Sequence, residues 1–219
     1  MRLRNKPWAA GVLAGCSYYY RQFDANAGHW HEVFGNDNPI WLEIGCGKGL
    51  YLAGMGPRHP EINFVGADIK GLVLAYGIRY IDEAYKNANM EVKNVKLISF
   101  DAERIVNSFK PEDTVDKIIL NFSNPWPKPK HWKKRLTYPK QLELYRTFLR
   151  DNGEILFKTD NDELYESSIV YFGEAGFEIT EKTDDYYSIY PRDEAVMTEH
   201  EKKFSDMGMP IHFIRAVKK

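Results

Sequence analysis

A run of seven residues at positions 43–49, EIGCGKG, combines a carboxylate with three glycines at alternate positions, Gly45, Gly47 and Gly49. It follows an apolar segment at 40–44 and precedes a segment of helical character that starts near Leu50. Glycines at such a junction allow a tight turn and let the backbone approach a ligand closely. The run is typical of a nucleotide-like cofactor site between a strand and a helix.

The residues around this turn discriminate between classes of cofactor. A dinucleotide-binding turn has its third glycine three residues after the second, and that position is Leu50 here. The carboxylate of Glu43 would repel a pyrophosphate, whereas it suits the cationic methionine end of S-adenosylmethionine. The sequence therefore favours S-adenosylmethionine, and a nicotinamide-dependent oxidoreductase is the competing class.

Two further carboxylates each follow an apolar run along the chain. Asp68 comes directly after 63–67, where it could accept the ribose hydroxyls, and Asp101 follows 95–100, where it could meet the adenine amino group. Either could instead cap a helix, since Asp is favoured at helix N-termini. Three acids after three successive strands, together with the glycine turn, favour the cofactor interpretation.

Alternating strands and helices are needed to position these residues. Apolar runs predict strands at 40–44, 63–67, 95–100, 115–122, 154–158, 177–181 and 211–217. Spacing predicts helices from about 50 and over 71–89, 139–150 and 164–175, with Asn152 and Gly153 ending the third of them. The result is an α/β fold with a doubly wound, mostly parallel, seven-stranded sheet. Residues 1–39 are expected to form an N-terminal arm packed on the core, and 40–219 a single domain.

The composition excludes several other classes of protein. The 219 residues are 43% hydrophobic and 28% charged with a net charge of −1, as in a globular domain. No apolar stretch approaches the roughly 18 residues of a membrane span, no signal peptide is recognised, and a cytoplasmic location is expected. Two cysteines, Cys16 and Cys46, make no metal-ligand spacing, so no metal is expected, and they weigh against cytosine-C5 methylation, which needs a cysteine nucleophile.

A proline-stiffened loop with a basic extension follows the fourth predicted strand. It begins Asn124-Pro125-Trp126-Pro127, and a run of cationic and aromatic residues comes next: Lys128, Lys130, His131, Trp132, Lys133, Lys134 and Arg135. A local basic cluster on a nearly neutral chain is what a polyanion-binding face looks like, although such a run can also be only a solvated surface.

Motifs across most of the chain resemble the bacterial tRNA (guanine-N7-)-methyltransferase family of the class I S-adenosylmethionine-dependent methyltransferases. They are FGNDNP at 34–39, EIGCGKG, NFSNPWPK at 121–128, RLTY at 135–138, FKTDN at 157–161 and MTEHEKKF at 197–204. The resemblance implies an antiparallel last strand, S-adenosylmethionine as cofactor, and tRNA as partner. It also implies methylation of N7 of a guanine in the variable loop, usually position 46. Whether the chain is a monomer or a homodimer stays open.

The resemblance also carries roles over to individual positions. Glu43, Asp68, Asp101 and Asn124, together with the three glycines, would bind the cofactor, and Asn124 and Asp160 would be catalytic. The substrate guanine would be met by Lys128, Asp160, Thr198, Glu199, His200 and Glu201. RNA contact would come from Lys130, His131, Trp132, Lys133, Lys134 and Arg135.

Asn124 departs from the family, which usually has Asp at this position. Guanine N7 has a free in-plane lone pair and no proton to lose, so catalysis is largely a matter of positioning. Asn can still accept a hydrogen bond through its oxygen but offers no negative charge. We expect retained, slower activity, with Asp160, Glu199 or Glu201 supplying the charge.

Two alternatives follow from this position. Amino-methyltransferases that act on an exocyclic NH2 of a base use an Asn/Asp-Pro-Pro-aromatic loop, and the order here is Asn-Pro-Trp-Pro. The other alternative is an RNA-binding relative whose catalysis is weakened or lost through Asn124.

Overall fold

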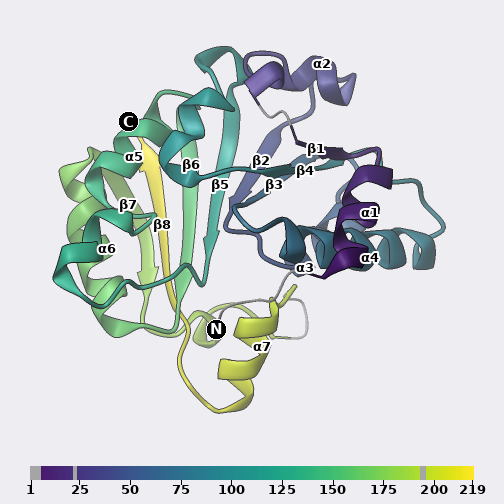
Figure 1. Cartoon of the computed structure of the whole chain (residues 1–219). Helices are drawn as coiled ribbons and strands as arrows, with labels where there is room; N and C mark the ends of the chain where they lie inside the picture. Colours follow the sequence, from purple (N-terminus) through teal and green to yellow (C-terminus); the bar gives the residue numbers. More distant parts are fainter. Residues whose placement is uncertain (1–5, 22–23, 193–195) are drawn as a thin grey trace.

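A mixed sheet of eight strands forms the centre of the fold in the computed structural model, which describes residues 6–21, 24–192 and 196–219 (Figure 1). The sheet order is β1-β4-β3-β2-β5-β6-β8-β7. The strands are β1 (Tyr19–Tyr20), β2 (Ile40–Ile44), β3 (Asn63–Asp68), β4 (Val95–Ser99), β5 (Val115–Asn121), β6 (Leu149–Thr159), β7 (Phe177–Thr183) and β8 (His212–Lys218).

Strand direction follows the expectation from sequence. Neighbours from β1 to β6 pair in parallel, and β8 runs antiparallel between β6 and β7. The expected antiparallel last strand is therefore confirmed, and the sheet has one strand more than expected. The extra strand is β1, whose residues pair with Leu97 and Ile98 of β4. Two residues are too few to give a recognisable alternating pattern.

Helices cover both faces of the sheet (Figure 1). They are α1 (Pro7–Gly15), α2 (Trp30–Phe34), α3 (Leu50–Met55), α4 (Gly71–Asn87), α5 (Pro139–Arg146), α6 (Asp162–Glu174) and α7 (Glu199–Asp206). Along β5, Ile118 and Leu120 join one core cluster and Ile119 the other. This alternation is the period of two by which a strand serves two hydrophobic layers.

One expected boundary is wrong. The helix expected over 139–150 ends at Arg146, and β6 already begins at Leu149. Asn152 and Gly153 do not end a helix. They lie inside β6, where the register with β5 shifts and Asn152 adopts a left-handed φ of 60°. An Asn-Gly pair fits such an irregularity in a strand as well as it fits a helix end, because both need a left-handed residue.

The described part of the arm contacts the sheet and its helices, while residues 1–5 and 22–23 lie outside the described residues. Trp8 of α1 packs its ring against Tyr76 and Arg79 of α4, and the hydroxyl of Tyr18 donates to Asp82 at 2.7 Å. Trp30 is fully buried and donates its indole N–H to the carbonyl of Ser108 at 2.8 Å. The arm therefore adds both a strand and core side chains.

Asp113 fixes the second half of the arm, and its removal should destabilise the fold. Its buried carboxylate accepts backbone N–H groups from Gly28, Trp30 and Lys110 at 2.9, 3.0 and 2.7 Å. Asp113→Ala leaves three donors without their acceptor, so we expect the free energy of unfolding to fall by about 3 kcal/mol in urea titrations. The exposed neighbour in Glu112→Ala is the control and should match the parent. Equal stability of both variants would contradict this role.

Candidate active site

The carboxyl ends of five adjacent parallel strands form one edge of the sheet, and the predicted site residues gather there. Glu43 is the next-to-last residue of β2 and Asp68 ends β3, while Asp101 follows β4 and Asn124 and Asp160 follow β5 and β6. Helix α7 lies beyond the same edge (Figure 1). Residues from six distant segments thus come together because parallel strands end on the same side.

The glycine turn between β2 and α3 is pinned to the end of β3. Gly45, Gly47 and Gly49 all have left-handed φ angles, of 80°, 54° and 63°, which side chains disfavour. The N–H of Gly45 donates to the carbonyl of Ala67 at 2.8 Å. A side chain at Gly77 of α4 would come within 3.2 Å of the carbonyl oxygen of Lys48, so this helix packs directly on the turn.

Glu43 presents a buried carboxylate with one oxygen still to be bonded. The residue is only 2% exposed, and Oε1 accepts a hydrogen bond from Nδ2 of Asn121 at 3.0 Å. Oε2 has no hydrogen-bond partner among the described residues. Burial raises the pKa of this carboxyl to about 8, against the opposing pull of Asn121 and Lys158. Oε2 is therefore available as an acceptor for a cationic ligand group. The cationic end of S-adenosylmethionine is a group of this kind.

The other two acids occupy their expected places and are also used by the protein. Asp68 accepts the N–H of Gly47 at 3.1 Å and that of Lys70 at 2.8 Å, and burial raises its pKa. Asp101 is exposed and caps a 3-10 helix by accepting the N–H of Glu103. Each carboxylate oxygen has a second lone pair, so capping does not prevent contact with a ribose or an adenine.

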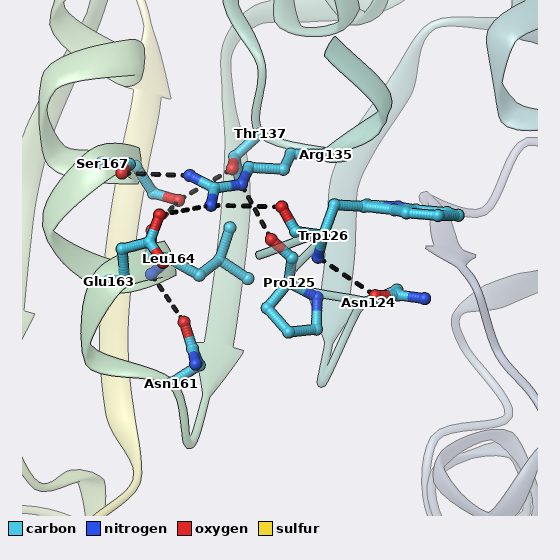
Figure 2. Close-up of polar contacts among 10 residues, drawn as sticks. Asn124, Pro125, Trp126, Arg135, Thr137, Asn161, Glu163, Leu164 and Ser167 are labelled. Atoms are coloured by element: carbon cyan, nitrogen blue, oxygen red, sulfur yellow. Dashed lines mark hydrogen bonds and ion pairs between the residues drawn. The ribbon is translucent and has the colours of Figure 1, made fainter. Parts of the chain in front are cut away.

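The loop after β5 holds two aromatic residues in left-handed backbone conformations. Phe122 has φ 50° and Trp126 has φ 45°, which is uncommon for bulky side chains. Asn124 is exposed, and its Oδ1 accepts the N–H of Trp126 at 3.1 Å (Figure 2). The side-chain oxygen that we expected to accept a hydrogen bond from the substrate thus accepts one from the backbone of its own loop. The amide nitrogen of Asn124 lies on the side of its oxygen opposite the backbone N–H of Trp126 in the same view.

Helix α7 brings two of its residues to the glycine turn and the loop after β5. Glu199 forms an ion pair with Lys48, at 2.6 Å between Oε2 and Nζ. The ring of His200 stacks on Phe122 with 6.5 Å between centroids. The segment 197–204 therefore reaches the same edge of the sheet as Glu43, Asp68 and Asp101.

Two reciprocal hydrogen bonds close the N-terminus of α7. Thr198 caps it by accepting the N–H of Glu201, and Glu201 accepts the N–H of Thr198 in return. Glu201 is fully buried, and its Oε1 also accepts from Lys158 Nζ at 2.6 Å and from the Tyr187 hydroxyl at 2.8 Å. In this arrangement Glu201 is enclosed by protein donors, so of the three acids expected to supply charge, Asp160 and Glu199 are the more accessible.

The basic segment divides into exposed and buried members. Lys128, Lys130, Lys133 and Lys134 are exposed, and His131 and Trp132 are half-buried. Arg135 differs, because its side chain is 0% exposed and pairs with Glu163 at 2.7 Å. Arg135 is therefore enclosed by protein in this structure, and its expected RNA contact stays a prediction.

Sequence reasoning missed three polar residues that complete the site: Asn121, Lys158 and Tyr187. Asn121 and Lys158 are opposite one another on β5 and β6. The signal that could have found Asn121 and Lys158 is a polar residue at the end of a strand that is otherwise apolar; Tyr187 lies in a 3-10 helix and gives no such signal. Such residues are costly to bury unless they are paired.

Two further features of the part of the chain that the structure describes are its possible metal ligands and its possible membrane spans. Among residues 6–21, 24–192 and 196–219, no group of three or more His, Cys, Asp or Glu side chains is placed to hold a metal ion. Within the same part of the chain, no helix is both long enough and apolar enough to cross a membrane.

Comparison with known proteins identifies relatives along the whole chain. A family model described as "Putative methyltransferase" matches residues 37–214. The tRNA (guanine-N(7)-)-methyltransferase of Clostridium beijerinckii is 47% identical, over 100% of this chain and 99% of the relative. Proteins of the same name from Clostridium perfringens and Acetivibrio thermocellus are 46% and 42% identical, over 100% of both chains in each case.

Solved structures at low identity share the fold. The 16S rRNA methyltransferase KamB has a TM-score of 0.64 at 14% identity, covering 87% of this chain and 92% of its own. A 16S rRNA (adenine(1408)-N(1))-methyltransferase from Catenulisporales acidiphilia, determined with its cosubstrate SAM, has a TM-score of 0.58 at 13% identity, covering 86% and 89%. Both likenesses concern the fold alone.

Burial of Glu43 predicts a pH-dependent stability. The folded pKa of about 8 lies above the ordinary value of 4.5, so the folded protein keeps a proton that the unfolded chain releases. The parent should therefore lose about 1.4 kcal/mol of unfolding free energy per pH unit between about 5 and 8 through this group. Glu43→Gln does not titrate, so its stability relative to the parent should rise over that range in urea titrations. Exposed Glu91→Gln is the control. A pH-independent difference for Glu43→Gln would contradict the assignment.

Proposed function

Since this chain belongs to the tRNA (guanine-N(7)-)-methyltransferase family, we propose that it methylates N7 of a guanine in the variable loop of tRNA, with S-adenosylmethionine as donor. The observation that carries the proposal is the meeting of the buried Glu43 carboxylate with the Asn124 loop at one edge of the sheet. Glu43, which would bind the cofactor, and the loop after β5, which would face the base, then lie at the same edge of the sheet. The expected location, the cytoplasm, and the alternatives of monomer or homodimer remain predictions.

The residues at the sheet edge fit S-adenosylmethionine, which supplies an electrophilic methyl group when bound. The free Oε2 of Glu43 is the acceptor for its cationic methionine end. The backbone of the glycine turn allows close approach, Asp68 takes the ribose hydroxyls, and Asp101 takes the adenine amino group.

Asn124 can contribute to orienting the guanine. Guanine presents two acceptors, N7 and O6, side by side on its major-groove edge. Oδ1 of Asn124 accepts the N–H of Trp126, so the amide NH2 is the part of this side chain that has no hydrogen bond among the described residues. Donation to O6 would hold the base while the N7 lone pair stays free to attack, and no general base is required.

The same contacts disfavour transfer to an exocyclic NH2. Gripping an amino group needs acceptor oxygens on the loop. The side-chain oxygen of Asn124 already accepts from Trp126, and the carbonyl of Pro125 accepts from Arg135 Nε at 2.8 Å, so each oxygen keeps only one lone pair for an amino group. The loop therefore offers a donor to the base where an amino-methyltransferase needs acceptors.

The activity is tested by incubating the protein with labelled S-adenosylmethionine and unmodified tRNA, followed by nucleoside analysis. We expect label in N7-methylguanosine of the variable loop. Label on an exocyclic nitrogen would support the amino-methyltransferase alternative. Binding of tRNA without any label would support a relative that has lost catalysis.

Asn124→Ala should lower kcat/KM about thirtyfold, because it removes the NH2 donor and frees the Trp126 N–H, at about 1 kcal/mol for each neutral hydrogen bond. Asn124→Asp also removes the NH2 donor, but it keeps the acceptor for Trp126 and adds a negative charge that can stabilise the positive charge developing on the base, so it should retain activity. Asp160→Ala and Glu199→Ala test the remaining charges in the same assay. Parent-like rates for Asn124→Ala, Asp160→Ala and Glu199→Ala together would overturn the roles proposed for these residues.

The exposed lysines of the basic segment should govern the salt dependence of tRNA binding. Each phosphate contact releases a counterion, so replacing one lysine should reduce the slope of log affinity against log salt by roughly 1. We expect Lys130→Gln combined with Lys133→Gln to weaken binding and lower the slope by about 2. Lys93→Gln, which removes an exposed lysine elsewhere, is the matched control. An unchanged slope would mean that the segment is only a solvated surface.

A further inference from the structure

Arg135 is enclosed at the end of a segment whose lysines face the solvent. Its guanidinium is 0% exposed, although a charged group is costly to bury without partners. The partners are present on two different segments (Figure 2). On α6, Nη2 pairs with Glu163 at 2.7 Å and Nη1 donates to Ser167 at 3.1 Å. On the loop after β5, Nε donates to the carbonyl of Pro125 at 2.8 Å and Nη2 approaches that of Trp126 at 3.5 Å.

These two carbonyls belong to the peptide planes on either side of the Trp126 α-carbon. Trp126 has a left-handed φ of 45°, a conformation that a bulky residue rarely adopts and that must be held from outside. One guanidinium contacts both planes, and the N–H of the first plane donates to Asn124. The direction in which the Asn124 amide faces is thus coupled to the position of the guanidinium.

Helix α6 provides a fixed base for this contact. Asn161 caps the helix by accepting the N–H of Leu164 at 2.8 Å. Thr137, two residues after the arginine, shares a 2.7 Å hydrogen bond with Ser168 of α6 (Figure 2). The arginine is therefore tied to a capped helix on one side and to the strained loop on the other.

The chemistry of the site requires arginine and not merely a positive charge. A guanidinium has five N–H donors in a rigid plane, which lets it serve several acceptors on two segments at once. A lysine ammonium is a compact, strongly hydrated charge on a flexible stem and does not reproduce this fork. The carboxylate of Glu163, which is half exposed, neutralises the buried positive charge of Arg135.

We propose that Arg135 is a positioning residue that holds residues 124–127 in their strained conformation, so that the Asn124 amide faces the base to be methylated. The inference rests on the proposed function for its catalytic consequence. The structural part concerns the loop alone and can be measured without tRNA.

The test compares Arg135→Lys with the parent in two independent measurements. Without tRNA, hydrogen exchange of the peptide covering residues 122–128 should become at least tenfold faster, because the loop loses its clamp. With saturating tRNA, kcat should fall at least tenfold, while the tRNA Kd, its salt slope and the affinity for S-adenosylhomocysteine stay within about twofold. Arg150→Lys, a change of the same chemistry at an exposed position, should behave as the parent in all of them.

A double-mutant cycle separates a positioning role from general damage. If the arginine acts through the loop, Arg135→Lys should reduce kcat much less in an Asn124→Ala background than in the parent. Lys134→Gln serves as the RNA-contact comparison and should lower the salt slope of tRNA binding. Should Arg135→Lys fold poorly, Glu163→Gln perturbs the same clamp from its exposed partner, and it should speed exchange of the same peptide with a smaller loss of kcat.

Two outcomes would overturn the proposal. One is unchanged kcat and unchanged exchange in Arg135→Lys, and the other is a weaker tRNA Kd with a reduced salt slope and an intact kcat, which would make Arg135 an RNA contact. If the parent itself makes no N7-methylguanosine, the proposed function fails. The exchange measurement still decides whether Arg135 holds the loop.

Discussion

The parallel pairing of β2 with β3 on one side and β5 on the other sets the position of every other part of the site. In this register Glu43 lies opposite Gly66 and Ile119, so its carboxylate is enclosed between two neighbouring strands. Gly66 has no room for a side chain, because an added Cβ would come within 2.2 Å of Leu52. The glycine turn, the acid of β3 and the loop after β5 all start from this block of three strands.

The segments that leave this block are held by backbone contacts of two kinds. In the glycine turn the left-handed residues are glycines, which adopt that conformation without strain. In the loop after β5 they are Phe122 and Trp126, whose conformation needs external support. Glycines in the turn allow close approach to a ligand. Supported non-glycine residues in the loop after β5 fix the direction of a few side chains. Two segments at the same edge of the sheet, the glycine turn and the loop after β5, are thus held in left-handed conformations by different physical means.

Much of the fold was readable from sequence because its strands are apolar and its helices periodic. The same pattern could not reveal β1, which has two residues, or the irregularity at Asn152, where a helix end and a strand share one signal. At the site, the acids after each strand were found from type and position. The role of Arg135 was not, because its partners Glu163 and Ser167 lie about 30 residues away along the chain and only folding brings them together. Lys158, and its pairing with Glu201 more than 40 residues further along the chain, escaped notice for the same reason.

Lys158 is shared between two carboxylates, and this arrangement has a consequence for proton balance. It bonds Glu201 directly and attracts Glu43 from a distance, so one buried cation faces two acids. With all three ionised the group would carry an excess negative charge in a region of low permittivity, and the proton on Glu43 removes that excess. A cationic ligand arriving at Oε2 does the same work. A cationic ligand bound at Oε2 would take the place of this proton, so its uptake at neutral pH would be accompanied by release of a proton to the buffer.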